Sequence, residues 1–258
     1  MIFYFSATGN CKQAAEQIAS QESDRLISIT EAMLNEQFSY AVEDNEKIGF
    51  ILPTYFYSTP RIVLDFAEKL SINNSIGKYV YIVLTFGTKT GKAGITLKNV
   101  LEKRGITVSA QYSIQTVDNY LPEFDIPTGE ELQKVLKKAD MQIKDIMNQI
   151  SDEKHGDMNS FEGTIPKIIA PLALQIYQHQ RKTSNFVVTN KCVGCGLCQK
   201  VCPVSAIEIK DKNPIWIKDK CTLCFGCLHR CPKAAIEYGK KTVGKGRYMN
   251  PNTKLYLK

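Results

Sequence analysis

The sequence predicts an α/β protein in two parts: a doubly wound parallel sheet of five strands over residues 1–155, and a small α+β domain over residues 186–240. Two observations carry this prediction. Short apolar runs alternate with helical patterns as far as residue 150, which is typical of a parallel sheet. Eight of the nine cysteines then lie between Cys192 and Cys231, in two copies of one pattern. A chain of 258 residues is long enough for a full-sized domain and a smaller one.

The first part contains five apolar runs that predict strands, separated by four stretches with helical periodicity. The predicted strands are 2–5, 26–29, 47–52, 79–86 and 106–114, and the predicted helices are 12–20, 61–70, 91–104 and 130–150. In such sheets ligands bind beyond the carboxyl ends of the strands. Three loops are therefore candidate binding segments: those after the first, third and fourth predicted strands.

The first of these loops combines small and hydroxyl residues between a strand and a helix. It consists of Ser6, Ala7, Thr8, Gly9, Asn10 and Cys11. This layout presents backbone N–H groups and a helix N-terminus to a phosphate, and the Ser6 and Thr8 hydroxyls and the Asn10 amide can add donors. The loop lacks a P-loop lysine and the spaced glycines of a dinucleotide fingerprint. It therefore suits one terminal phosphate better than a pyrophosphate or a triphosphate.

The other two loops carry aromatic and small polar residues. The residues expected to bind a ligand are Pro53, Thr54, Tyr55, Phe56 and Tyr57 in one loop, and Thr85, Phe86, Gly87 and Thr88 in the other. Three consecutive aromatic residues after a buried strand favour stacking on a planar ring. The alternative is that one or two of these rings only cap the hydrophobic core.

The cysteines form two runs, each of three cysteines at intervals of three residues followed by a Cys-Pro pair. The runs are Cys192, Cys195, Cys198 and Cys202, and Cys221, Cys224, Cys227 and Cys231. Bacterial ferredoxins hold two 4Fe–4S clusters with this spacing, and the fourth cysteine of each run binds the other cluster. One cluster is therefore assigned to Cys192, Cys195, Cys198 and Cys231, and the other to Cys221, Cys224, Cys227 and Cys202.

Zinc binding and a disulfide framework are the alternatives to clusters for these cysteines. Zinc sites usually show pairs of ligands, not a triplet followed by Cys-Pro. A disulfide framework is typical of exported proteins, and Met1 leads directly into an apolar strand with no signal-like segment. The predicted compartment is the cytoplasm, where thiols stay reduced.

These motifs together resemble a known family. The loop from Ser6 to Cys11 is similar to the phosphate loop of flavodoxins, which implies an FMN-binding, flavodoxin-like domain over residues 1–155. The whole chain resembles the EFR-type ferredoxins, in which a flavodoxin-like domain precedes a two-cluster 4Fe–4S ferredoxin domain and which are common in anaerobic bacteria. Cys11 departs from the threonine usual in flavodoxins. It is expected either to weaken phosphate binding or to be a redox-sensitive thiol whose pKa the helix N-terminus lowers.

The remaining segments are predicted to connect and flank the domains. Residues 156–185 are expected to form a linker and a helix over 165–180, whose apolar side packs on a domain through Ile168, Ile169, Leu172, Leu174 and Ile176. The strand at 186–189 is expected to pair with one after a cysteine run, such as 207–209. Trp216 is expected to shield a cluster, and His229 to lie at the surface.

Charge divides the chain unevenly. Residues 1–160 carry 16 Lys and Arg against 21 Asp and Glu, and residues 161–258 carry 17 against 5, giving −5 and +12 of the total +7. The basic tail at 241–258 is interpreted either as a solvated segment or as part of a docking surface for an acidic redox partner. Nothing in the sequence supports nucleic-acid binding or a membrane span.

Two one-electron clusters beside a flavin predict electron transfer. The leading hypothesis is a carrier or adaptor that exchanges electrons between FMN, the clusters and redox partner proteins, with no catalytic residues of its own. The alternatives are a flavin-dependent reductase of a small molecule, and an interaction module whose clusters are structural.

Overall fold

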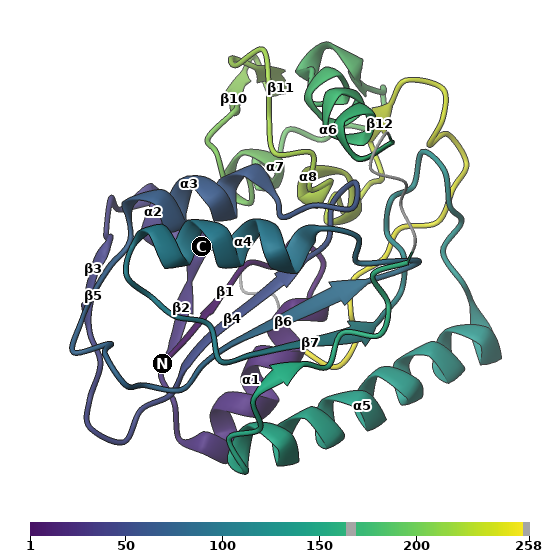
Figure 1. Ribbon diagram of the computed structural model, residues 1–258. Helices are drawn as coiled ribbons and strands as arrows, with labels where there is room; N and C mark the ends of the chain where they lie inside the picture. Colours follow the sequence, from purple (N-terminus) through teal and green to yellow (C-terminus); the bar gives the residue numbers. More distant parts are fainter. Residues whose placement is uncertain (164–168, 255–258) are drawn as a thin grey trace.

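The computed structural model describes residues 1–163 and 169–254, and its central feature is a parallel sheet. The strand order is β2–β1–β4–β6–β7–β8 (Figure 1). These strands are Ile2–Tyr4 (β1), Leu26–Ser28 (β2), Ile48–Pro53 (β4), Val80–Phe86 (β6), Ala110–Gln115 (β7) and Gly156–Asp157 (β8). Without β8 the order is that of flavodoxin-like folds, so the predicted fold class is confirmed.

The sheet has a sixth strand that the sequence analysis assigned to a linker. Gly156–Asp157 pairs in parallel with β7, and the N–H of Met158 donates to the Gln111 carbonyl over 2.9 Å. Pairing along a sheet edge uses backbone groups, so a polar segment with no strand-like side chains can join it. The prediction of five strands was therefore one short strand too few.

Helices cover both faces of the sheet (Figure 1). One face carries α1 (Asn10–Glu22) and α5 (Gly129–Ser151), and the other carries α2 (Ile29–Leu34), α3 (Arg61–Lys69) and α4 (Ala93–Lys103). Because both faces are covered, β4 and β6 are apolar throughout and almost wholly buried. A second, two-stranded parallel pair of β3 (Ser39–Ala41) and β5 (Ser71–Asn73) extends the fold, and the sequence analysis did not predict it.

The second part of the chain is a small domain with two antiparallel pairs of strands and two single-turn helices. Strand β9 (Phe186–Val188) pairs with β12 (Ile236–Tyr238), and β10 (Ile207–Lys210) pairs with β11 (Asn213–Trp216). The helices are α7 (Leu197–Lys200) and α8 (Gly226–His229), one in each cysteine run. The strand at 186–188 thus pairs with a strand after the second cysteine run; the example of 207–209 was wrong.

Helix α6 (Ile169–Gln180) lies at the top of Figure 1 and contacts both parts of the chain through Tyr177 and Gln180. The Tyr177 ring stacks on Phe56 at a centroid distance of 5.2 Å, and its hydroxyl donates to the Thr222 carbonyl over 3.1 Å. Ile176, which was expected to pack, is exposed. Ile168 and the side chains of Ile169, Leu172 and Leu174 lie outside the described residues.

The segment after β12 returns to the first part of the chain and reaches α1 (yellow in Figure 1). Thr242, Tyr248 and Asn250 are buried, and Arg247 pairs with Glu237 at 2.8 Å. The interpretation of this segment as a solvated tail is therefore wrong for these residues. Hydrogen bonds and buried contacts hold it against the body of the molecule.

In the part of the chain that the structure describes, none of the helices combines the length and the apolar character that a membrane span needs.

Candidate functional site

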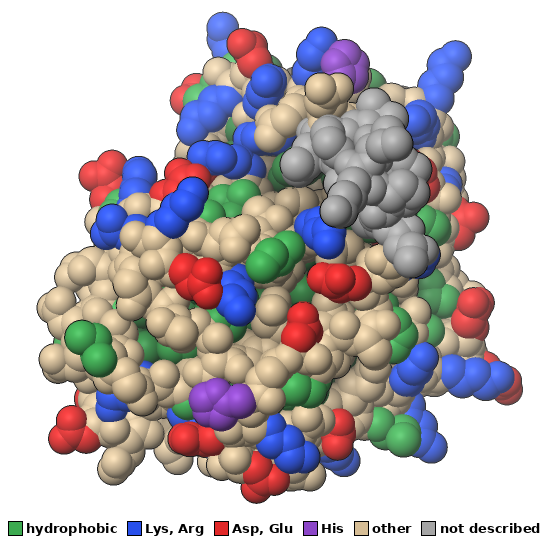
Figure 2. All heavy atoms as spheres, viewed as in Figure 1, with side chains coloured by type: hydrophobic (Ala, Val, Ile, Leu, Met, Phe, Trp, Pro, Cys, Tyr) green, Lys and Arg blue, Asp and Glu red, His purple; other side chains and the backbone are tan. Residues whose placement is uncertain are grey.

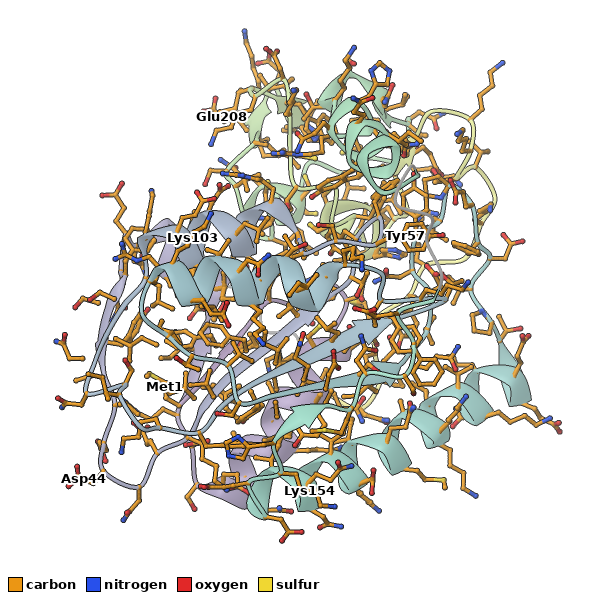
Figure 3. The ribbon with its side chains drawn as sticks, in the orientation of Figure 1. Met1, Asp44, Tyr57, Lys103, Lys154 and Glu208 are labelled. Atoms are coloured by element: carbon orange, nitrogen blue, oxygen red, sulfur yellow. The ribbon has the colours of Figure 1, made fainter. Side chains whose placement is uncertain are left out.

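A cavity lies at the carboxyl ends of β1, β4, β6 and β7, where the first part of the chain meets the second. Its empty volume, which includes space open to solvent, is about 960 Å³. Tyr57, one of its lining residues, lies where the sheet meets the smaller domain (Figure 3). The cavity is where parallel sheets bind ligands.

The three loops expected to bind a ligand all line this cavity. Every residue named for it in the sequence lines it except Gly9. Those residues are Ser6, Ala7, Thr8, Asn10, Cys11, Pro53, Thr54, Tyr55, Phe56, Tyr57, Thr85, Phe86, Gly87 and Thr88. Loops distant in sequence converge here because the parallel strands deliver their carboxyl ends to one edge.

Gly9 has a different role, because it shapes the loop and faces the C-terminal segment. Its φ of +106° is a conformation that other residues rarely adopt. A Cβ at this position would stand 2.9 Å from the Asn250 Cβ and 2.9 Å from the Thr253 Cγ2. The Gly9 N–H donates to the Ser6 Oγ over 3.1 Å, which closes the loop above the N-terminus of α1.

A fourth loop lines the cavity, and the sequence analysis missed it. Residues 116–120 follow β7 and bond to the first loop: the Asn119 amide donates to the Thr8 Oγ1 over 2.6 Å. The Asn10 amide donates to the Thr116 Oγ1 and the Val117 carbonyl. The Asn10 amide, which was expected to donate to a phosphate, thus has two partners within the chain. The available sequence signal for this loop was its position after a predicted strand. The loop was missed because it contains no glycine and no run of aromatic residues.

The three aromatic residues after β4 have three different environments. Tyr55 is packed edge-on against Phe5 at 6.3 Å, and Phe56 lies between Tyr120 and Tyr177. Tyr57 is 39% exposed at the cavity. Of the three rings, Tyr57 is thus the one with a face least occupied by protein. Phe86, in the next loop, packs against Phe161 at 4.8 Å.

Cys11 is buried, and its sulfur lies 3.1 Å from the Thr85 Oγ1. Burial raises the pKa of the Cys11 thiol to about 12. The hypothesis that the helix N-terminus lowers the pKa of this thiol is therefore wrong, because loss of water around the sulfur outweighs the helix dipole. Cys11 is a small, protonated packing residue.

The donors and acceptors of this cavity fit a flavin mononucleotide. Thr54 lines it, and the buried hydroxyl of this residue has no hydrogen-bond partner among the described residues. The first turn of α1 and the loop before it supply N–H groups for one phosphate. Tyr57 supplies an aromatic face, and Val117, Phe124 and Leu223 supply apolar surface for a ring system.

The cysteines line two further cavities in the smaller domain, and each cavity collects one of the predicted ligand sets. One is lined by Cys192, Cys195, Cys198 and Cys231, with an empty volume of about 370 Å³. The other is lined by Cys202, Cys221, Cys224 and Cys227, with about 300 Å³. The fourth cysteine of each run thus lies with the other run, as the crossing pattern predicts.

Backbone N–H groups point at several of these sulfurs. The N–H of Ala206 donates to Cys202 over 3.2 Å, that of Leu223 to Cys221 over 3.3 Å, and that of Ala235 to Cys231 over 3.3 Å. Such bonds stabilise thiolates and tune the potential of a cluster. Gly194 takes a φ of +69° close to the Lys212 carbonyl, so the first cysteine loop needs a residue without a Cβ there.

The cysteine sulfurs of the two cavities are the candidate ligands for iron. Among the described residues no three His, Cys, Asp or Glu side chains are grouped to hold one metal ion. A 4Fe–4S cluster takes each thiolate on a different iron, which spreads the ligands around it. Burial raises the pKa of the Cys224 thiol to about 12 and that of Cys221 to about 11, and bound iron displaces these protons.

The flavin-type cavity and the second cysteine cavity share a wall. Cys224 and Phe225 line both of them. Phe225 is buried, and its ring lies 5.6 Å from Tyr120 and 5.9 Å from Phe186. Trp216 lines the cysteine cavity and stacks on Phe186 at 5.1 Å, as expected of a residue that shields a cluster.

His229 is buried, so its predicted surface position is wrong. Its Nε2 lies 2.8 Å from the Asn119 carbonyl, and its Nδ1 accepts the Tyr248 N–H over 3.2 Å. Burial lowers the pKa of His229 to about 4, so the ring is neutral at pH 7 and its Nε2 carries the proton. No sequence signal marks this residue, because both of its partners are remote in the chain.

Two family models match the chain, one on each part. A model described as a flavodoxin domain matches residues 1–118, and one described as a 4Fe–4S dicluster domain matches residues 191–236. A search of curated proteins found no match. The matches agree with the cavity at the sheet edge and with the two cysteine cavities.

Solved structures resemble the first part of the chain. They include a Fusobacterium nucleatum flavodoxin bound to flavin mononucleotide (18% identity, covering 59% of this chain and 96% of that one, TM-score 0.36). They also include a Streptococcus pneumoniae TIGR4 flavodoxin (18% identity, covering 56% of this chain and 97% of that one, TM-score 0.32). A rubredoxin:oxygen oxidoreductase from Desulfovibrio gigas is matched over a smaller share of its length (14% identity, covering 58% of this chain and 36% of that one, TM-score 0.30). Because these TM-scores are low, the domain assignment depends on the family models. The chain is a flavodoxin–ferredoxin fusion that carries FMN and two 4Fe–4S clusters and has a redox, electron-transfer role.

Proposed function

We propose that this protein passes electrons within one chain between FMN and its two clusters, and serves as a carrier or adaptor for redox partner proteins. The order of centres is FMN, the cluster of Cys221, Cys224, Cys227 and Cys202, and then the cluster of Cys192, Cys195, Cys198 and Cys231. The observation that supports this order is the shared wall of Cys224 and Phe225. The first cysteine cavity has no lining residue from the flavodoxin domain.

The cofactors supply the redox chemistry: the flavin exchanges two electrons, and each cluster exchanges one. The chain positions them and excludes water. Phe225, Tyr120 and Phe56 form a packed aromatic group that lines the cavity beside the second cysteine run. The N–H groups of the loop before α1 bind the phosphate, and those of Leu223 and Ala206 stabilise thiolates.

The first cysteine run is the proposed point of contact with a partner. Cys195 is exposed, and so is Val193 beside it. The lysines nearest in sequence to this cavity, Lys191, Lys212 and Lys233, are exposed as well. Figure 2 shows many Lys and Arg side chains on the upper part of the molecule, where the ferredoxin domain lies. An acidic redox protein is the matching partner, and charge of this kind mainly raises the association rate.

Dilution tests the internal transfer. The loaded chain is photoreduced at its clusters, and flavin reduction is followed by absorbance at several protein concentrations. A rate constant independent of concentration supports transfer within the chain. A rate that falls in proportion to dilution means that the domains act as separate carriers. Continuous turnover of a small-molecule acceptor without a partner protein would instead support a flavin-dependent reductase.

A further inference from the structure

The C-terminal segment over residues 242–254, named here the strap, bonds directly to the phosphate loop. The Asn250 N–H donates to the Thr8 carbonyl over 2.7 Å. The Asn250 side chain donates to the Gln13 Oε1 over 2.7 Å and to the Asn10 Oδ1 over 3.1 Å. Asn250 and its three partners are all buried. The strap thus contacts the loop at Gly9, where the missing side chain leaves room for Asn250 and Thr253.

Tyr248 completes the hydrogen bonds of Asn10. Its hydroxyl donates to the Asn10 Oδ1 over 2.7 Å. The Asn10 amide nitrogen already donates to Thr116 and Val117, so each end of this side chain has partners. Asn10 is the first residue of α1, and its backbone N–H belongs to the phosphate-binding turn. The strap and the loop after β7 therefore hold this turn in one orientation between them.

The strap is also bonded to the cluster-binding part of the chain. His229 lies in α8 between Cys227, a ligand of one cluster, and Cys231, a ligand of the other. Its Nδ1 accepts the Tyr248 N–H, and its Nε2 donates to the carbonyl of Asn119. The Asn119 amide in turn bonds Thr8. One histidine in the cluster helix therefore supports both sets of contacts to the phosphate loop.

We propose that the strap couples FMN affinity to cluster content, with His229, Tyr248 and Asn250 as positioning residues for the flavin phosphate. The clusters hold α8, α8 holds the strap through His229, and the strap holds the phosphate loop in its binding conformation. A preorganised loop binds more tightly because less conformational freedom is lost on binding. Coupling of this kind is reciprocal, so bound FMN also stabilises the clusters. The inference rests on the proposed FMN site.

The phosphate gives the proposal a specific signature. The strap contacts the phosphate loop, so its loss weakens binding of FMN but not of riboflavin, which lacks the phosphate. General damage to the fold would weaken both ligands. Binding of each is measured on the loaded, full-length chain after exchange of its flavin, by the quenching of flavin fluorescence.

Tyr248→Phe and Asn250→Ala are the test variants, and Met249→Ala is the matched control. Met249 lies between them in the strap but is 52% exposed. Tyr248→Phe removes one buried hydrogen bond and Asn250→Ala removes two. Loss of one such bond weakens affinity about three- to tenfold, and loss of two weakens it at least as much. We expect this loss for FMN in both test variants, unchanged riboflavin affinity and unchanged iron content. Equal FMN affinity in all three variants would overturn the proposed role of the strap. Failure of the unmodified chain to bind FMN would instead overturn the proposed FMN site.

Removal of the clusters tests the coupling. A chelator is added to the loaded chain under anaerobic conditions, and cluster absorbance and free-FMN fluorescence are recorded together. The FMN concentration is chosen so that the loaded chain is saturated. In the unmodified chain, FMN is then expected to dissociate as the clusters are lost. In Tyr248→Phe the FMN affinity is already reduced, so cluster loss changes it by a smaller factor. The same factor in both chains would contradict transmission through the strap.

Discussion

The ring of Phe225, from the second cysteine run, lies 5.6 Å from the ring of Tyr120, from the loop after β7. These residues belong to different domains, and both line the FMN cavity. Phe225 takes a left-handed backbone conformation with φ of +54°, and it lines the cavity next to Cys224. Tyr120 also packs on Phe56. The FMN cavity and the cavity of the nearer cluster thus meet at a wall that contains Cys224 and packed aromatic rings.

Phe225→Leu is expected to slow internal electron transfer without loss of iron. Leucine keeps much of the apolar volume, so the cost in stability is about 1 kcal/mol, but it leaves the shared wall less well packed. Phe186→Leu is the control, because Phe186 lines the cysteine cavity and not the FMN cavity. The measurement is flavin reduction after photoreduction of the clusters. Equal slowing in both variants would mean that Phe225 has no special position.

Cys202→Ala is expected to remove the cluster of the second run and to leave that of the first. Cys202 lies in one cavity with Cys221, Cys224 and Cys227, although it follows the first run in sequence. The unmodified chain should bind about eight irons and eight sulfides, and the variant about half. Iron and sulfide analysis with EPR measures this. Cys11→Ser is the control and should keep all of its iron. Loss of the first-run cluster in Cys202→Ala would refute the assignment of Cys202 to the cluster of the second run.

Gly9→Asp is expected to abolish FMN binding and to leave the clusters intact. A side chain at φ +106° is strained, its Cβ meets Asn250, and its carboxylate repels the phosphate. Gly77→Asp is the control, since Gly77 also has a positive φ (+76°) but nothing lies near its Cβ position. Stoichiometric FMN retained by the Gly9 variant would argue against the assigned phosphate loop.

Cys11 is expected to resist thiol reagents in the folded chain. Its pKa of about 12 leaves almost no thiolate at pH 8, and its side chain is 2% exposed. Because burial raises this pKa, reactivity should appear only near pH 12 or on unfolding. Mass spectrometry of the alkylated, loaded protein measures labelling at this position. Rapid labelling of Cys11 at pH 8 would restore the redox-sensitive thiol hypothesis.

Spacing along the chain was enough to predict the cysteine sets and three of the cavity loops. Three cysteines at three-residue intervals can wrap one cluster wherever they stand, and Ser6–Cys11 forms its loop between a strand and a helix. These features depend on neighbours in sequence. The same holds for strands such as β4 and β6, whose apolar runs are long enough to predict burial on both sides.

The tertiary structure alone decided how the two domains share a wall and how the chain end returns to the phosphate loop. Tyr248 and Asn10 stand 238 positions apart, and His229 and Asn119 stand 110 apart. None of these polar residues stands out within its own segment of sequence. Each acquires its hydrogen-bond partner only because packing of the two domains brings the two residues together and excludes water. Long-range contacts of this kind depend on the summed burial of both surfaces, so no local pattern encodes them. Packing of α1 on the sheet buried Cys11, and contact between the domains buried His229, and this reversed what their sequence neighbours had indicated.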